Sequence, residues 1–397
     1  MIALCTKKGF AMRFKTTVVS ALLTCSVFVL PANAADLQDT RKIAFPVAQD
    51  GSHVLVVDTH THSVFSDGSV WPNIRVSEAV QSGLDMLTVT EHIDYQPKFA
   101  DLPNLDRNRA FEVTHEAAAS GAPEILVVNG VEIAQPDASL GTYSGHFNAI
   151  FLNDANALLL PTRKNLPPRV DWRKAVQGAK AQDAVIIWNH SWWDQGRTEP
   201  QTFHQALLDG KVIDGLEVAN ADQYSESAFR FALDHDMAIV GGSDLHSTQQ
   251  SFFDRTGIEQ RTSTLVLAEN KTEAAIKQAF LSRRTVALYN HTLIGRERDV
   301  RPIVEGALTL HVVSISQPGD PFGFGRIALR NASSSPFSLR RIGDDTIMDA
   351  GALITVPVYG EVVLAFKSKA GEQRPTMSFE VLNAQIEPHT PLRITLK

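Results

Sequence analysis

The sequence predicts an α/β fold, with a parallel β-sheet that is open or closed into a barrel, followed by a small β-sandwich-like domain. Two patterns support this prediction. From about residue 53 to residue 289, short apolar runs of strand length alternate with longer stretches of helical length; such alternation is typical of parallel strands joined by crossover helices. After about residue 301, strand-like runs continue without helices, and Gly, Pro, Ser and Asp separate them, as in β-sandwiches.

The expected elements follow one another in a regular order. The strand candidates of the first region are residues 54–58, 86–90, 125–131, 147–152, 185–189, 215–219, 238–242 and 263–268. The helical candidates between them include residues 75–81, 107–119, 172–182, 225–234 and 273–282. In the second region the strand candidates are residues 308–315, 326–331, 337–341, 354–358, 362–367, 378–382 and 392–396. We therefore expect an N-terminal extension over 35–52, an α/β domain over 53–300 and a β-rich domain over 301–397.

The first 34 residues have the pattern of a cleavable secretory signal peptide. Four basic residues precede an apolar stretch over 16–30, and residues 32–34 read Ala-Asn-Ala, an A-x-A cleavage site. We expect cleavage near Ala34 and a periplasmic or secreted protein without a membrane segment. Both cysteines, Cys5 and Cys25, lie in this segment, so the mature chain would have no thiolate as a nucleophile or metal ligand.

The charge of the chain argues against general binding of nucleic acid. The formal net charge is −7, and it becomes −11 without the signal segment, which holds four basic residues and no acidic one. A chain this acidic repels the phosphate backbone of DNA or RNA. An anionic substrate would need local positive charge, such as that of bound metal ions.

Residues of the kinds that bind metals lie at or just after the ends of the predicted strands. His60 and His62 follow the first strand, and side chains two positions apart in an extended segment point the same way and can share one ion. Asp244 and His246 repeat this spacing after the seventh strand. An isolated H-x-H pair often occurs at a protein surface by chance, so the prediction of a metal site depends on the other candidates.

Five further candidates complete the set. His92 follows the second strand, Glu132 ends the third and His190 follows the fifth. In a barrel the carboxyl ends of all strands converge on one face, which would bring these residues together. Asp67 would reach this face from the first loop, whereas His146 precedes its strand and is harder to place. Glu132 is either a solvent-exposed rim residue or the partner of a cation, because a buried unpaired carboxylate is costly.

The order of these motifs, H-x-H, Asp, (D/E)-H, Glu, His, His and S-D-x-H, resembles the PHP (polymerase and histidinol phosphatase) superfamily over about residues 54–288. The ligand positions of that family are all filled here, by His60, His62, Asp67, His92, Glu132, His146, His190, Asp244 and His246. The resemblance implies a distorted (β/α)7 barrel with a trinuclear centre of divalent Mn, Zn or Fe. Many relatives have Asp at the position of Glu91.

The resemblance also implies how the ligands divide among the three ions. One ion would be held by His60, His62, Glu132 and Asp244. A second would be held by Glu132, His146 and His190, with the carboxylate of Glu132 bridging the two ions. The third would be held by Asp67, His92 and His246.

Longer segments resemble the secreted PHP phosphodiesterases of the Sb-PDE type, namely residues 62–72, 91–97, 145–152 and 293–297. That likeness implies hydrolysis of a P–O bond of a small organophosphate diester by a hydroxide that bridges two metal ions. Asp244 or His246 would pass a proton to the leaving alcohol. The expected partner is thus a small-molecule phosphate ester.

The residues that contact the substrate are less clearly marked. Arg261 and Arg197 are candidates to neutralise the non-bridging phosphate oxygens, with a solvent-facing salt bridge as the alternative for each. Trp192 and Trp193 either form an apolar wall for an alkyl or aryl group or pack in the core. Glu217 ends its strand and either orients a ligand, touches substrate or lies on the rim.

Three alternative functions remain open. The first is a phosphomonoesterase of the same superfamily, and the second is an amidohydrolase-like metallohydrolase. The latter type commonly bridges its metals with a carboxylated Lys, whereas this chain has Glu132 at the bridging position. The third is a non-catalytic binding module, although degenerate barrels usually lose ligands and this chain has kept them.

Overall fold

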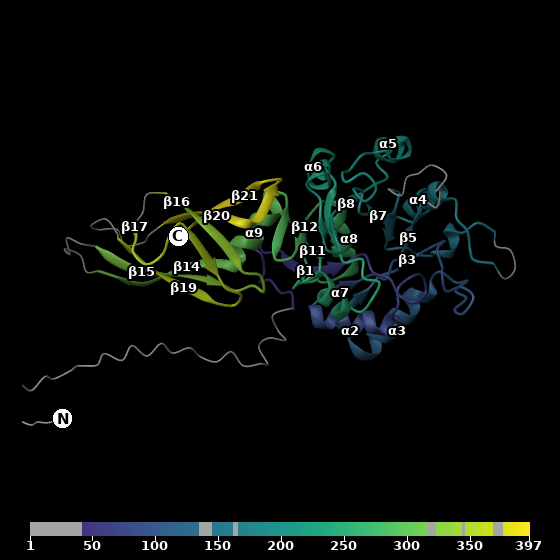
Figure 1. Cartoon of the computed structure of the whole chain (residues 1–397), viewed down its shortest axis with the longest axis horizontal. Coiled ribbons are helices and arrows are strands. Elements are labelled where there is room, and N and C mark those ends of the chain that lie inside the picture. Colours follow the sequence, from purple (N-terminus) through teal and green to yellow (C-terminus); the bar gives the residue numbers. More distant parts are fainter. Residues whose placement is uncertain (1–41, 135–144, 162–165, 317–322, 344–345, 368–375) are drawn as a thin grey trace, which may run out of the picture.

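The computed structural model describes residues 42–134, 145–161, 166–316, 323–343, 346–367 and 376–397. The expected signal segment and its cleavage site near Ala34 lie outside these residues. In Figure 1 the chain from residue 308 onwards occupies one end of an elongated molecule, and the α/β part occupies the other. Within the described residues no helix is both long enough and apolar enough to span a membrane.

One sheet joins the α/β part to the C-terminal part. Its strands, in order of pairing, are β4 (Leu126–Val127), β2 (Met86–Leu87), β1 (His53–Asp58), β11 (Ser263–Ala268), β12 (Thr285–Tyr289), β13 (Thr292–Gly295), β20 (Met377–Glu387), β16 (Phe337–Ile342) and β18 (Leu353–Val356), with β21 (Thr390–Leu396) on β20. Strands β1, β2 and β4 are parallel, whereas β1, β11, β12 and β13 pair antiparallel in turn. The parallel pair of β13 and β20 crosses between the two parts.

A second sheet carries most of the remaining α/β strands. Its order is β10 (Ala238–Gly242), β8 (Gly215–Asn220), β7 (Val185–Trp188), β6 (Phe147–Ile150), β5 (Gly130–Ile133) and β3 (Glu91–His92), with β9 (Gln223–Tyr224) on β8. Strands β10, β8 and β7 are parallel, as are β3 and β5. Strand β6 runs antiparallel to both of its neighbours.

The predicted α/β class with a C-terminal β-rich part is confirmed, but the sheet is mixed and not purely parallel. The two sheets meet where the Thr264 hydroxyl exchanges hydrogen bonds with the backbone N–H and C=O of Gly241, both at 2.9 Å. Among the described residues, the strands of the α/β part pair into two sheets and not into one continuous ring. Closure of the barrel therefore stays a prediction.

Helices flank these strands. They are α2 (Pro72–Ser82), α3 (Arg109–Gly121), α4 (Trp172–Ala181), α5 (Thr202–Asp209), α6 (Glu226–Asp234), α7 (Gln249–Thr256), α8 (Glu273–Leu281) and α9 (Glu297–Ala307), with a short 3-10 turn, η2 (Asn156–Leu158). Of these, α2, α3, α4, α6 and α8 lie close to the predicted helical segments, whereas α5, α7 and α9 lie outside those segments. Side-chain caps explain several of the starts, because each satisfies a backbone N–H that has no partner within the helix. Asp171, Ser225, Thr248 and Thr272 cap α4, α6, α7 and α8 in this way.

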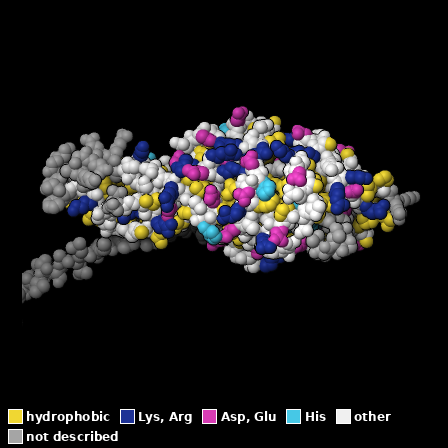
Figure 2. All heavy atoms as spheres, turned by 90° about the horizontal axis from the view of Figure 1, so that it is seen from above, with side chains coloured by type: hydrophobic (Ala, Val, Ile, Leu, Met, Phe, Trp, Pro, Cys, Tyr) yellow, Lys and Arg dark blue, Asp and Glu magenta, His cyan; other side chains and the backbone are white. Residues whose placement is uncertain are grey.

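The C-terminal part adds a separate sheet, in the order β14 (Leu308–Ile315), β15 (Phe324–Asn331), β19 (Glu361–Lys367) and β17 (Thr346–Ile347). Its apolar interior is continuous with that of the α/β part, because Val300 and Val304 of α9 belong to the same core cluster as Phe379 and Val381 of β20. Figure 2 shows basic and acidic side chains interspersed over the face that it views.

Candidate metal centre

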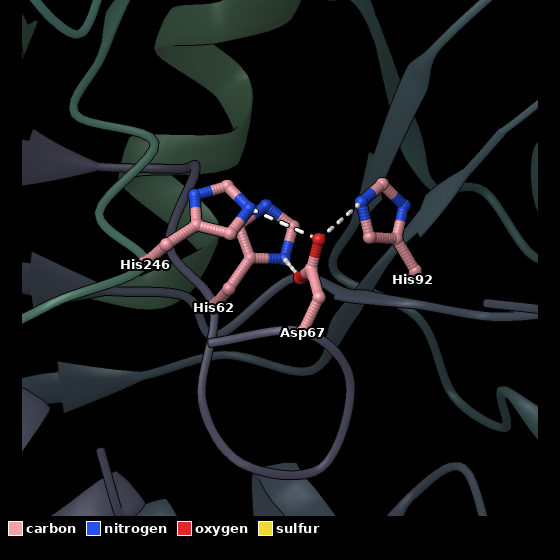
Figure 3. A group of neighbouring side chains, drawn as sticks. All are labelled: His62, Asp67, His92 and His246. Carbon is pink, nitrogen blue, oxygen red and sulfur yellow. Dashed lines mark ion pairs between the residues drawn. The ribbon is translucent and has the colours of Figure 1, made fainter. Parts of the chain in front are cut away.

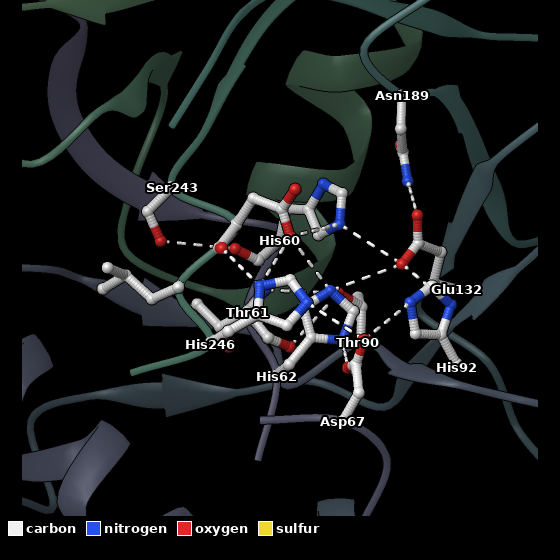
Figure 4. A network of polar contacts seen from close by, with 12 residues as sticks. His60, Thr61, His62, Asp67, Thr90, His92, Glu132, Asn189, Ser243 and His246 are labelled. Atoms are coloured by element: carbon white, nitrogen blue, oxygen red, sulfur yellow. Dashed lines mark hydrogen bonds and ion pairs between the residues drawn. The ribbon is translucent and has the colours of Figure 1, made fainter. Parts of the chain in front are cut away.

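The nine candidate ligands come together around the ends of the α/β strands. Figure 4 shows six of them, namely His60, His62, Asp67, His92, Glu132 and His246. They form four overlapping groups, in each of which the ligand atoms lie within 4.8 Å of one another: His62, Asp67, His92 and His246; His60, Glu132 and His190; His60, His62 and Asp244; and His92, Glu132 and His146. Segments far apart in sequence thus supply one cluster of imidazoles and carboxylates.

The innermost part of the cluster follows β1. His60 and His62 are fully buried, and their Nε2 atoms lie 3.3 and 3.1 Å from Oδ1 of Asp244. The same two nitrogens lie 3.5 and 3.3 Å from Oε2 of Glu132. Ligand atoms about 2.1 Å from a central ion lie roughly 3.0–3.4 Å from one another in octahedral or tetrahedral geometry. These spacings therefore fit four ligands of one divalent ion.

A second group surrounds Asp67, which reaches the cluster from the loop after β1 (Figure 3). Its Oδ2 lies 3.2 Å from Nε2 of His246 and 3.5 Å from Nε2 of His92. Its Oδ1 lies 3.5 Å from Nδ1 of His62. The structure thus brings together the three residues expected to share an ion, with one ring of the H-x-H pair beside them.

The position of His146 is explained by the direction of its strand. Because β6 runs antiparallel to β5 and β7, its first residues lie beside the last residues of those strands, as the pairing of Phe147 with Ile133 and Trp188 shows. His146 therefore reaches Glu132, with Nδ1 2.9 Å from Oε1. Nε2 of His190, which follows β7, lies 3.6 Å from the same oxygen.

Several buried ligand atoms have no hydrogen-bond partner among the described residues, which tests whether the cluster fits a cation. These atoms are His60 Nε2, His62 Nε2, His92 Nδ1, Glu132 Oε2, His190 Nδ1 and Asp244 Oδ1. An unsatisfied buried polar group costs about 1–3 kcal/mol and a charged one costs more. Divalent ions bound by imidazole and carboxylate would satisfy these atoms, so the residues present fit the expected metals.

The charges within the cluster also favour cation binding. Burial alone would raise the pKa of Glu132, but the neighbouring imidazoles of His92, His60 and His146 hold that pKa well below its usual range. Burial lowers the pKa of His62 to about 4, so this ring is neutral and can donate a lone pair. In the metal-free protein, burial is outweighed at His92 by nearby carboxylates, which raise its pKa to about 9.

Glu217 fixes the orientation of two candidate ligands. It is fully buried, and its Oε1 lies 2.8 Å from Nδ1 of His60. Its Oε2 accepts hydrogen bonds from the backbone N–H of His190 at 3.0 Å and from the Asn220 amide at 2.9 Å. The carboxylate keeps the His60 proton on Nδ1 and leaves Nε2 free to bind an ion. Of the three predicted roles, the geometry thus supports that of orienting a ligand.

The predicted phosphate-binding role of Arg261 is not supported by the structure. Its side chain is only 1% exposed, and its Nε and Nη2 lie 2.7 and 2.6 Å from Oδ2 of Asp58. Oδ1 of Asp58 in turn accepts from the backbone N–H groups of His60 and Ser243 at 3.1 and 3.2 Å. Arg261 therefore braces the backbone beneath the cluster. Arg197, the other candidate, is exposed and pairs with Glu199.

The two tryptophans after His190 take different positions. Trp192 is buried and donates from Nε1 to the side chain of Gln223 at 2.9 Å. Trp193 is 59% exposed, and its ring lies edge-on to that of His190 with 4.8 Å between the centroids. Trp192 therefore packs in the core, whereas Trp193 is available to contact a substrate.

Arg75 is a supporting residue that the sequence did not single out. It is fully buried in α2, and its Nε and Nη2 donate to the backbone carbonyls of His62 and Leu245, both at 2.8 Å. One guanidinium thus holds together the two loops that carry the H-x-H and D-x-H motifs. The sequence does contain a signal for this role. Arg75 lies next to Val76 and four residues before Ala79, so it places a charged side chain on the apolar face of a helix.

Glu91 supports the loop that carries Asp67. Its carboxylate accepts from the backbone N–H of Ser63 at 2.9 Å and from the hydroxyls of Ser63 and Ser66. Burial raises the pKa of Glu91, and these donors oppose that shift. Glu91 therefore supports the ligand-bearing loop by direct contact.

Comparison with known proteins identifies the family. A crystal structure of a two-domain protein from Bacteroides vulgatus ATCC 8482, described as containing a predicted PHP-like metal-dependent phosphoesterase, is 33% identical in sequence and superposes with a TM-score of 0.76. The match covers 89% of this chain and 98% of that one. A family model described as an Ig-like domain matches residues 325–397. No curated protein is significantly similar in sequence.

Two further structures match less of the chain. A protein from Bifidobacterium adolescentis ATCC 15703, assigned as a metal-dependent phosphoesterase, is 18% identical with a TM-score of 0.38, over 58% of this chain and 97% of that one. An amidohydrolase from Chromobacterium violaceum is 17% identical with a TM-score of 0.35, over 49% and 88%. Likenesses this distant say nothing about the chemistry of this chain. The identity and coverage of the Bacteroides match show that the chain belongs to the PHP-like metal-dependent phosphoesterases.

Proposed function

We propose that this chain is an exported phosphodiesterase that uses three divalent ions, Mn, Zn or Fe, to hydrolyse a P–O bond of a small organophosphate diester. The observation that carries the proposal is the group of buried ligand atoms that have no hydrogen-bond partner among the described residues. The diester preference is supported by the resemblance of residues 62–72 and 91–97 to the Sb-PDE type of PHP phosphodiesterase.

Each ion would have its own set of ligands, with Glu132 shared between two sets. The sets that the family resemblance implies would be His60, His62, Glu132 and Asp244; Glu132, His146 and His190; and Asp67, His92 and His246. All nine residues belong to the overlapping groups of neighbouring ligand atoms. When bound, divalent ions supply Lewis acidity, which acidifies water and neutralises negative charge on phosphoryl oxygens.

The protein's own residues would set which imidazole nitrogens carry protons and from which side water and substrate reach the cluster. Nδ1 of His246 donates to the backbone carbonyl of Asp244 at 2.9 Å, so that Nε2, which faces Asp67, is the nitrogen that would bind an ion. His246 is 41% exposed at its side chain, whereas His60 and His62 are fully buried. Water and substrate therefore reach the cluster from the side of Asp244 and His246. A proton passed to the leaving alcohol would come from this side.

Activity on bis(p-nitrophenyl) phosphate tests the proposal. Protein treated with a chelator should lose activity and regain it with manganese, zinc or iron. Metal analysis should give three ions per chain. The double variant His60→Ala/Asp244→Ala should lose turnover, and full turnover by that variant would refute the mechanism. A higher kcat/KM on p-nitrophenyl phosphate than on the diester would replace the diesterase proposal by a phosphomonoesterase.

Export is tested separately. The full chain expressed in a Gram-negative host should be found in the periplasm or medium with its N-terminus near Ala35, as read by mass spectrometry of the purified protein. A cytoplasmic protein that keeps residues 1–34 would contradict export and leave the proposed chemistry unaffected.

A further inference from the structure

A pocket of about 280 Å³ opens directly beside the candidate metal centre. Three candidate ligands, His190, Asp244 and His246, line it together with Trp193, Phe252 and Arg255. Pockets for drug-sized ligands are commonly about 300–1,000 Å³, so this volume suits a small phosphate ester. A ligand that fills the pocket would therefore contact both the candidate ligands and Arg255.

The position of Arg255 follows from the short helix α7. That helix begins soon after His246, where the hydroxyl of Thr248 accepts from the backbone N–H of Ser251. Phe252 and Arg255 are three residues apart and share one helix face, which is the face that lines the pocket. Phe252 is 5% exposed, and the guanidinium of Arg255 lies 5.7 Å from the centre of its ring.

The guanidinium of Arg255 is available to a ligand. It is exposed, and it makes no hydrogen bond or ion pair with any residue that the structure describes. By contrast, Arg261 and Arg75 are buried and committed to Asp58 and Glu78. A guanidinium offers paired N–H donors that match two oxygens of a phosphate, and it keeps its charge at any working pH.

Trp193 provides the apolar contact in the same pocket. Its ring lies edge-on to His190 at 4.8 Å and to His146 at 6.2 Å between centroids, while more than half of its surface is exposed. An aromatic ring that is held at its edge and open on its face stacks well against a flat or apolar ester group.

We propose that this pocket is the substrate site, in which Arg255 binds non-bridging oxygens of the scissile phosphate and Trp193 packs against an aryl or alkyl ester group. This inference rests on the proposed phosphoesterase function and assigns to Arg255 the phosphate-binding role that Arg261 cannot fill. The substrate class is a phosphate ester with at least one compact apolar alcohol.

The test compares Arg255→Ala with a matched control, Arg173→Ala. Arg173 is also an exposed helical arginine above an aromatic ring, at 4.6 Å from the ring of Trp172, but it does not line the pocket. Loss of a charged hydrogen bond corresponds to about a 10- to 150-fold effect. We expect kcat/KM on bis(p-nitrophenyl) phosphate to fall by about this factor for Arg255→Ala, to recover partly for Arg255→Lys and to stay unchanged for Arg173→Ala.

A second measurement does not depend on turnover. Isothermal titration calorimetry of metal-loaded protein with inorganic phosphate should show weaker binding for Arg255→Ala, with metal content and Tm unchanged. Trp193→Ala should raise KM for the bis-aryl ester more than for methyl p-nitrophenyl phosphate. Wild-type kcat/KM and phosphate affinity in Arg255→Ala would overturn the inference, as would loss of metal or a lowered Tm. Inactive wild-type protein would instead refute the proposed function, while phosphate binding would still test Arg255.

Discussion

Replacement of Glu217 by Gln changes a single side-chain atom, but we expect it to weaken metal binding, because Glu217 contacts the candidate ligands His60 and His190. Oε1 faces Nδ1 of His60 at 2.8 Å, and Oε2 accepts from the N–H of His190 and the amide of Asn220 at 3.0 and 2.9 Å. A carboxylate accepts on both sides, whereas an amide can accept on only one. If the Gln NH₂ faces His60, it forces the ring proton onto Nε2, the atom that must bind an ion. If it turns the other way, it faces two N–H donors.

The expected loss is set by how much such supporting residues contribute. Replacing a carboxylate that orients a metal-binding histidine typically lowers metal affinity by about 10- to 100-fold, which corresponds to about 1.4–2.7 kcal/mol. We expect the lower part of this range when Gln adopts the orientation that keeps the His60 tautomer. The nearly isosteric change leaves the packing intact, so metal affinity should fall by more than the metal-free stability.

Metal affinity of Glu217→Gln is measured by competition with a fluorescent zinc chelator, and stoichiometry by elemental analysis. Glu124→Gln is the control, because Glu124 is exposed and lies outside the cluster. Wild-type affinity at all sites in Glu217→Gln would refute the claim that Glu217 sets the His60 tautomer. Equal losses in Glu217→Gln and Glu124→Gln would point to a general charge effect.

Removal of bound ions should lower Tm, and each ion present at 100 times its Kd should restore about 2.7 kcal/mol; a Tm that does not respond to ions would contradict metal binding. Metal binding at pH 7 should release protons, because the pKa of His92 is raised to about 9 in the metal-free protein and the bound proton must leave. Calorimetry in buffers of different ionisation enthalpy measures this release, and its absence would show that the ring is already neutral. Gly242→Ala should cost about 1–3 kcal/mol of stability and reduce metal content, since its Cβ would press on Glu217 and lie 2.8 Å from Cβ of His60. Gly121→Ala, whose Cβ would meet nothing within 4 Å, is the control in denaturant unfolding.

The sequence predicted most of the candidate ligands because strand ends are readable. An apolar run that stops at Glu132 or just before His190 marks the end of a strand, and strand ends meet on one face. The position of His146 could not be predicted in this way, because the alternation with helices led to an expectation of parallel strands. The stretch between β5 and β6 is rich in Gly, Pro, Ser and Asp. Such composition favours an antiparallel return over a crossover helix, and it is the signal that would have placed His146.

The supporting contacts could not be predicted, because they join residues far apart in sequence. Arg261 and Asp58 are separated by 203 positions, and Arg75 and Leu245 by 170. The sequence placed Arg261 correctly near the cluster, but only the structure shows that its guanidinium points to Asp58 and not to solvent. The same limit applies to Arg255, because only the structure shows which face of α7 lines the pocket.

Two candidate ligands sit on strained backbone, which indicates that this site is built at a cost to the fold. His190 and Asp244 have positive φ angles of 24° and 49°, and such conformations cost of order 1–3 kcal/mol each outside glycine. The unpartnered ligand atoms add to that cost. The hydrogen bonds from His190 N–H to the carboxylate of Glu217 and from Asp244 N–H to the carbonyl of His60, at 3.0 and 2.8 Å, hold both residues in place. Metal binding would therefore offset strain and desolvation that the polypeptide has already accepted, and stability and catalysis should depend on the same ions.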